Sequence, residues 1–140
     1  MIRTTPGPLA LTLILTGLLA LVPGCKDEGP SDPDVSDIVF PASGVSYGQH
    51  VDALFQQRCA FSGCHAGANP QRGLDLLAPS YDALRNHLPT LVISGEPDNS
   101  LLVQMLEGTV QPRMPYNRTP LTANQLTGIR TWISEGALNN

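Results

Sequence analysis

The first 44 residues restrict the fold of this chain most, because they leave only residues 45–140 for a packed domain. An uncharged apolar run from Leu9 to Val22 follows the single charge of Arg3. The run is shorter than a membrane-spanning helix requires, and small residues follow it, as in secretory signals. This pattern predicts an export signal peptide over residues 1–24.

The junction "VPGC" at residues 22–25 resembles the cleavage site of bacterial lipoproteins, with an apolar residue, a variable one, Gly and then Cys. The resemblance implies cleavage before Cys25 and a lipid on its sulfur, which anchors the exported protein to a bacterial membrane. Lys26 after Cys25 favours the outer membrane over the periplasmic face of the inner one, by resemblance to bacterial sorting. The other interpretation is ordinary secretion, with Cys25 as an unpaired thiol.

Residues 25–44 are rich in Pro, Gly, Ser and Asp and have few apolar side chains before Ile38. Such a stretch cannot bury enough surface to fold, so we expect a flexible tether with a mean reach of roughly 25 Å. It carries most of the net negative charge of the exported chain, because Asp27, Glu28, Asp32, Asp34 and Asp37 face the single base Lys26. Residues 45–140 hold six bases and seven acids, which predicts no basic face for nucleic acid.

Four segments of the remaining domain have apolar residues at helical spacing, with capping or terminating residues at their ends: 46–59, 80–88, 97–108 and 122–136. The last is the best defined, because Thr122 and Gln125 have the spacing of a capping box. A loop with three prolines, residues 109–120, separates the last two segments. We therefore predict a small all-α domain with long loops, which needs a metal, disulfide or cofactor to complete its core.

The segment "CAFSGCH", residues 59–65, carries the most specific chemistry. In c-type haem sites two cysteines form thioethers to the porphyrin, and the histidine directly after the second lies under the iron. The order Cys59, Cys64, His65 matches this arrangement, although the spacer has four residues where two are usual. Gly63 supplies backbone freedom that the longer spacer needs.

Two other interpretations of this segment remain open. Cys59 and Cys64 could form a disulfide, with His65 as an exposed loop residue. A zinc site would need two further ligands, and His50 and His87 do not have the spacing of a zinc finger.

From residue 45 to 137 the order of motifs resembles a bacterial class I cytochrome c domain. A helix leads into "CAFSGCH", the turn "SGEPDNSLL" precedes a middle helix, "RMP" occupies 113–115, and "LTANQLTGIRTWISEGA" closes the domain. The resemblance implies one covalent haem c on Cys59 and Cys64, with His65 as proximal and Met114 as distal iron ligand. It also implies a packing role for Trp132.

Other residues could ligate the iron in place of Met114. Met105 lies on an apolar stripe with Leu101, Leu102 and Leu106, where a methionine usually packs in the core. His50 and His87 are expected at the surface, and either could serve as a sixth ligand. Met114 stands off any stripe between two prolines, which favours it.

Histidine and methionine together leave no open position on the iron for a substrate. The resemblance therefore implies a carrier of single electrons between redox partner proteins of the cell envelope, and not an enzyme. The alternative is a haemless, disulfide-bonded binding module on the cell surface. A peroxidase-like enzyme is a third possibility, but it would require an open distal site.

Overall fold

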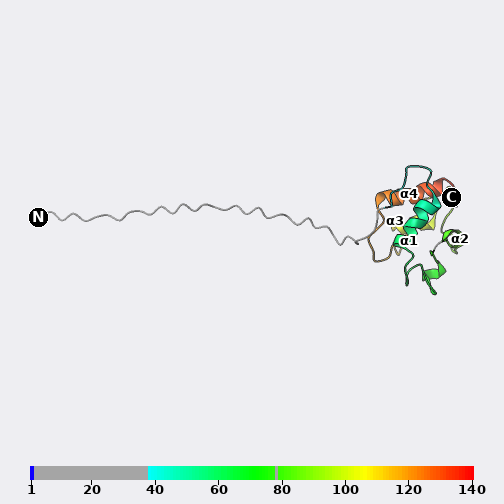
Figure 1. Cartoon of the computed structure of the whole chain (residues 1–140), viewed down its shortest axis with the longest axis horizontal. Helices are drawn as coiled ribbons and strands as arrows, with labels where there is room; N and C mark the ends of the chain where they lie inside the picture. The colour runs from blue at the N-terminus through cyan, green and yellow to red at the C-terminus, as the bar shows by residue number, and fades with distance from the viewer. Residues whose placement is uncertain (2–37, 78) are drawn as a thin grey trace. The chain divides into compact units, whose positions relative to one another are not determined.

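The computed structural model describes Met1, residues 38–77 and residues 79–140, and within these ranges the chain is helical without a β-strand. The four α-helices are α1 (Ala53–Arg58), α2 (Tyr81–Arg85), α3 (Leu101–Glu107) and α4 (Ala123–Ser134) (Figure 1). A π-helix, η1 (Tyr47–Asp52), runs directly into α1, and a 3-10 turn, η2 (Gln71–Gly73), interrupts the long loop before α2. α4 packs against both α3 and η1. The expected small, mostly helical class is therefore confirmed.

No helix of the described ranges has the length and apolar character needed to cross a membrane. The expected signal peptide, the lipidated Cys25 and the tether up to residue 37 lie outside the described residues.

The first helical segment forms where its periodicity predicts it. The Ser46 hydroxyl accepts a hydrogen bond from the Gln49 amide and caps the start of η1. Val51, Leu54 and Phe55 are fully or almost fully buried, as their i, i+3, i+4 spacing indicates. The segment ends at Cys59, so the helix delivers the chain directly into the cysteine motif.

The last helix also begins as predicted, with a complete capping box. The Thr122 hydroxyl accepts from the Gln125 amide, and the Gln125 side chain accepts from the Thr122 amide. Its buried face contains Gln125, Gly128, Ile129, Trp132 and Ile133. The packing role expected of Trp132 is confirmed, since its ring is almost fully buried beside Tyr47.

Phe40, in the stretch that the composition assigns to the tether, packs onto α4. The Asn124 side chain accepts from the Phe40 amide and donates to the Phe40 carbonyl. The Phe40 ring is buried against Gly128, where an added Cβ would stand 2.1 Å from ring atoms. The Glu135 carboxylate accepts from the amides of Gly44 and Val45. The packed region thus begins before the expected boundary at residue 45, because its partners lie on the last helix.

The two middle helices are shorter than predicted. α3 begins at Leu101 and not near Pro97, because the Ser100 hydroxyl donates to the Glu96 carbonyl and holds a turn ahead of the helix. Its buried residues are Val103 and Leu106. Ser80 does not cap α2 through its side chain; it is buried and hydrogen-bonded to Tyr47 and Asp52.

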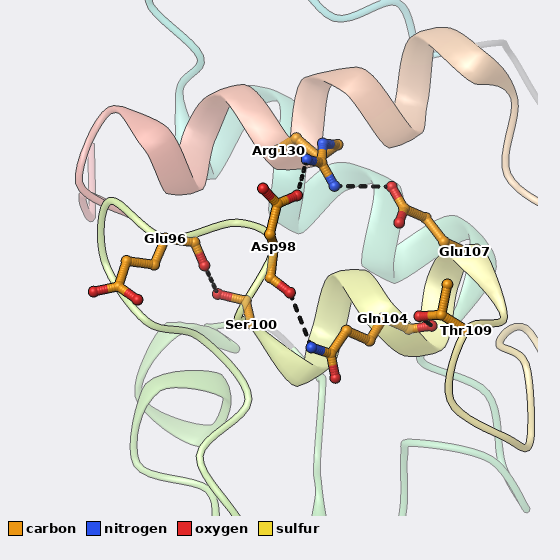
Figure 2. A network of polar contacts seen from close by, with 7 residues as sticks. All are labelled: Glu96, Asp98, Ser100, Gln104, Glu107, Thr109 and Arg130. Carbon is orange, nitrogen blue, oxygen red and sulfur yellow. Dashed lines mark hydrogen bonds and ion pairs between the residues drawn. The ribbon is translucent and has the colours of Figure 1, made fainter.

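A polar network joins α3 and the turn before it to α4 (Figure 2). The Arg130 guanidinium of α4 pairs with the carboxylates of Asp98 and Glu107. The Gln104 side chain donates to the Asp98 carbonyl at 2.9 Å. These contacts fix the middle helix, whose far end leads into the loop that carries Met114.

Candidate functional site

The segment from Cys59 to His65 forms a tight loop closed by its own backbone. The His65 amide donates to the Cys59 carbonyl at 3.2 Å, and the Cys64 amide donates to the Phe61 carbonyl at 2.9 Å. Gly63 has a φ of +81°, in the left-handed region that favours glycine. The four-residue spacer is therefore taken up by a turn, and the backbones of Cys59 and His65 meet across it.

The chain after the motif fastens this loop to the core. The Gln71 amide donates to the Cys64 carbonyl at 2.7 Å, and the Leu76 amide donates to the His65 carbonyl at 2.8 Å. The side chains of Leu74 and Leu76 are buried in the hydrophobic cluster. The motif is thus held on both sides, by α1 before it and by this buried segment after it.

Cys59 and Cys64 are half-buried, free thiols. Burial raises the pKa of the Cys59 thiol to about 12. The positive charges of Arg58 and Arg118 oppose this rise, and Cys64 adds to it. At neutral pH Cys59 is therefore a protonated thiol in a mostly apolar setting, with two arginines close by.

His65 is half-buried, and its Nδ1 atom is enclosed without a hydrogen-bond partner. Burial lowers the pKa of His65 below its usual value of 6.5, although backbone contacts with Leu74 and Gln71 act in the opposite direction. The side chain is thus a neutral imidazole at neutral pH. A neutral imidazole with an unused nitrogen is the form in which histidine binds metals.

The loop of residues 109–120, which carries Met114, lies against the cysteine motif. The Arg118 guanidinium stands 4.3 Å from the centre of the Phe61 ring, in the spacer between the two cysteines. Arg58, the last residue of α1, donates from Nη2 to the Thr119 carbonyl at 2.8 Å. Two contacts therefore join segments that lie about 60 positions apart in sequence.

Met114 itself is half-buried and packs against the hydrophobic cluster. Its amide donates to the Met105 carbonyl at 2.9 Å, which anchors the loop to α3. The next residue, Pro115, is buried. The sequence-predicted residues Cys59, Cys64, His65 and Met114 thus lie on two loops that the fold brings into contact.

The two histidines that could replace Met114 as a ligand have ring nitrogens within hydrogen-bonding distance of backbone groups. The Nδ1 atom of His50 accepts from the Ser46 amide at 3.1 Å, and its ring contacts Phe40, at the opposite end of the helical segment from Cys59. His87 lies near the motif, with Nε2 3.0 Å from the Arg72 carbonyl and Nδ1 3.3 Å from the Pro89 carbonyl. Within the described ranges no group of three or more His, Cys, Asp and Glu side chains could hold a metal ion.

The burial of Met105 differs from the prediction. Its place on the apolar stripe of the middle helix predicted a core position, but the side chain is half-buried. The chain turns at Ser100 before α3 begins, which directs Val103 and Leu106 into the core. Leu101 and Leu102, assigned to the same stripe as Met105, are also only partly buried.

A cavity of about 300 Å³ exists in another part of the molecule and involves none of these residues. Its lining includes Tyr47, Asp52, Tyr81 and Asp82. The hydroxyls of Tyr47 and Ser80 beside it have hydrogen-bond partners, since the Ser80 hydroxyl is hydrogen-bonded to both Tyr47 and Asp52.

Sequence reasoning did not identify Arg58, Phe61 and Arg118 as part of the site. Arg58 and Phe61 flank Cys59, but nothing in the sequence pairs them with a loop so far along the chain. Only the composition of that loop, with two arginines near Met114, gives a weak signal. In comparisons with protein-family models, curated proteins and solved structures, no match was found.

Proposed function

We propose that this protein is a lipid-anchored c-type cytochrome that carries single electrons between redox partner proteins at the cell envelope. Cys59 and Cys64 would hold one haem c through thioether bonds, and His65 and Met114 would ligate its iron. The lipid on Cys25 keeps the domain at the membrane. In this proposal the protein is an electron carrier and not an enzyme.

The observation that carries the proposal is the contact between the cysteine motif and the Met114 loop. The two contacts from Arg118 to Phe61 and from Arg58 to Thr119 hold these loops together. A haem bound to the motif would therefore have the methionine loop as its neighbour. This supports Met114 over His50, which lies at the far end of the first helical segment.

The donor atoms themselves support a haem. The free thiols of Cys59 and Cys64 are available for bond formation, and the enclosed Nδ1 of His65 lacks a partner. The half-buried thioether of Met114 is a soft ligand that suits ferrous iron. A bound haem would supply the one-electron redox chemistry of iron, which no side chain of this domain provides.

The chain's own residues have distinct roles in this function. The backbone of the motif loop positions the two thiols and His65 relative to one another, and burial keeps the imidazole neutral. Buried Pro115 and the Met105 carbonyl hold Met114 in place. A thioether ligand in an apolar setting would raise the reduction potential.

The test is the absorption spectrum of the exported protein, oxidised and reduced, with a haem stain on a denaturing gel. We expect one covalent haem in the parent and none in the Cys59→Ser/Cys64→Ser variant. A protein without haem whose mass is two units below that of the reduced chain would contradict the proposal. That result would establish a disulfide between the two cysteines and would favour the alternative, a haemless binding module.

A further inference from the structure

The cavity of about 300 Å³ brings together segments that are far apart in the sequence. Its lining comes from η1, from the start of α2 and from the chain after α4. Ligand pockets in proteins measure roughly 300–1,000 Å³, so this cavity suits a small solute. None of the four residues proposed to hold haem lines it, and it therefore needs a separate explanation.

Two tyrosine rings form a corner of this cavity. The rings of Tyr47 and Tyr81 stand at 84° to one another, with their centroids 5.0 Å apart. Both hydroxyls are already bound within the domain, that of Tyr47 to Ser80 and that of Tyr81 to the Ala137 carbonyl at 2.9 Å. The tyrosines can therefore offer a ligand ring surface, mostly that of half-buried Tyr81, and their hydroxyls hold the rings in place before a ligand enters.

The charged groups of the lining all have the same sign. Asp52 and Asp82 contribute two carboxylates, and none of the described lining residues is a base. Neither carboxylate forms an ion pair with a described residue, whereas the Arg130 guanidinium pairs with two other carboxylates of the domain. The cavity thus holds negative charge that the fold itself does not neutralise.

The hydrogen bonds of Asp52 leave part of its carboxylate available. The side chains of Ser80 and Gln56 both donate to Oδ1, and Oδ2 has no hydrogen bond to a described residue. The uncompensated charge also reaches the neighbouring phenol. Burial is the main cause that raises the pKa of Tyr47 to about 12, and the negative charges of Asp52 and Asp82 add to the rise.

We propose that this cavity binds a small organic ammonium ion of the size of choline, with Asp52 and Asp82 balancing its charge and the tyrosine rings contacting its alkyl groups. An alkylated ammonium is attracted both by carboxylates and by aromatic rings, whereas an anion would be repelled. A metal ion fits less well, because the described ranges contain no group of three or more metal-ligating side chains. The inference goes beyond the proposed function and needs no bound haem.

Isothermal titration calorimetry of the full-length exported protein in a non-ionic detergent, with choline chloride as the probe, tests this site. The neutral alcohol 3,3-dimethyl-1-butanol has the shape of choline without its charge, and it should bind at least about tenfold more weakly. Equal affinities for the two compounds would overturn the inference, as would an absence of choline binding. So would a preference for calcium ions over choline, or binding to phosphatidylcholine vesicles without binding to free choline.

Variants of the lining locate the binding. Asp82 is exposed, and its carboxylate has no partner among the described residues, so Asp82→Asn should fold and bind choline about threefold to tenfold more weakly. Glu96→Gln is the matched control, because it removes an exposed carboxylate outside the cavity and should stay within about twofold of the parent. Equal losses in these two variants would contradict the site.

Two substitutions of Tyr81 separate its ring from its hydroxyl. Tyr81→Leu should bind choline about tenfold more weakly, whereas Tyr81→Phe keeps the ring and should stay within about threefold of the parent. Thermal unfolding of both variants identifies any loss that comes from the fold. Equal losses in two folded variants would show that the ring does not contact the ligand, and would overturn the inference.

Discussion

At the scale of single residues, the two methionines of the middle region differ in what holds them. Met114 is fixed through its amide on Met105 and by the contacts of its loop with the motif. Met105 is a half-buried residue of α3 whose carbonyl accepts the hydrogen bond from the Met114 amide. From this difference we expect Met114 to be the iron ligand and Met105 to support its loop.

We expect Met114→Ala to abolish the sulfur-to-iron charge-transfer band of the oxidised protein and to lower its reduction potential, because a soft thioether favours ferrous iron. Met105→Ala is the control, and it should keep the band. Its cost in stability should fall below the roughly 2–5 kcal/mol of a fully buried methionine, since the side chain is half-buried. A band that survives in Met114→Ala would exclude this residue as the ligand.

His65 should also make stability depend on pH. Unfolded histidine binds a proton below about pH 6.5, whereas burial keeps the folded imidazole neutral and lowers its pKa. The unfolded state then binds more protons, so the free energy of unfolding falls as the pH drops below about 6.5. Iron ligation by His65 would also lower the free energy of unfolding at low pH, since a protonated imidazole cannot bind metal.

Denaturant unfolding of the parent and of His65→Gln at about pH 7 and pH 5 would measure this effect. The parent should lose more stability between the two values than the variant does. The same loss in both proteins would assign the pH dependence to other groups.

At the scale of elements, the close approach of the segment before η1 to α4 depends on one glycine. A Cβ at Gly128 would stand 2.1 Å from the Phe40 ring, which is too close for any real contact. Phe40 also bonds Asn124 through its backbone, so the segment cannot move away without losing those bonds. The glycine therefore permits a contact that extends the core beyond the four α-helices.

We expect Gly128→Ala to destabilise the domain by about 1–3 kcal/mol, because overpacking forces Phe40 out of its site. Gly48→Ala is the matched control on η1, where the nearest atom to an added Cβ is 3.6 Å away. Thermal unfolding followed by circular dichroism measures both. In a Phe40→Ala background Gly128→Ala should cost much less, and equal costs in the two backgrounds would contradict the packing argument.

At the scale of the whole molecule, the proposed function requires that the domain remain at a membrane. We expect Cys25→Ser to release the protein into the soluble fraction, because two acyl chains on one cysteine suffice for stable anchoring. Cys59→Ser is the control, and it should leave the distribution unchanged. Fractionation of cells followed by immunoblotting distinguishes them, and a Cys25→Ser protein that stays with membranes would refute the anchor.

The sequence by itself determined the features that depend on neighbouring residues. The caps at Ser46 and Thr122, the helix end at Gly108 and the buried face of the first segment all follow from contacts within a few positions. The four candidate haem-binding residues, Cys59, Cys64, His65 and Met114, also come from the sequence, by motif order alone. Haem attachment and lipidation remain predictions from those motifs.

Tertiary structure decided what depends on residues far apart in the chain. Phe40 packs on Gly128, Ser80 turns inward to Tyr47 and Asp52, and α3 starts late because of the turn at Ser100. The contact between Arg118 and Phe61 joins the motif to the methionine loop. Local propensity could not reveal these pairings, since each depends on which surfaces meet when the core closes.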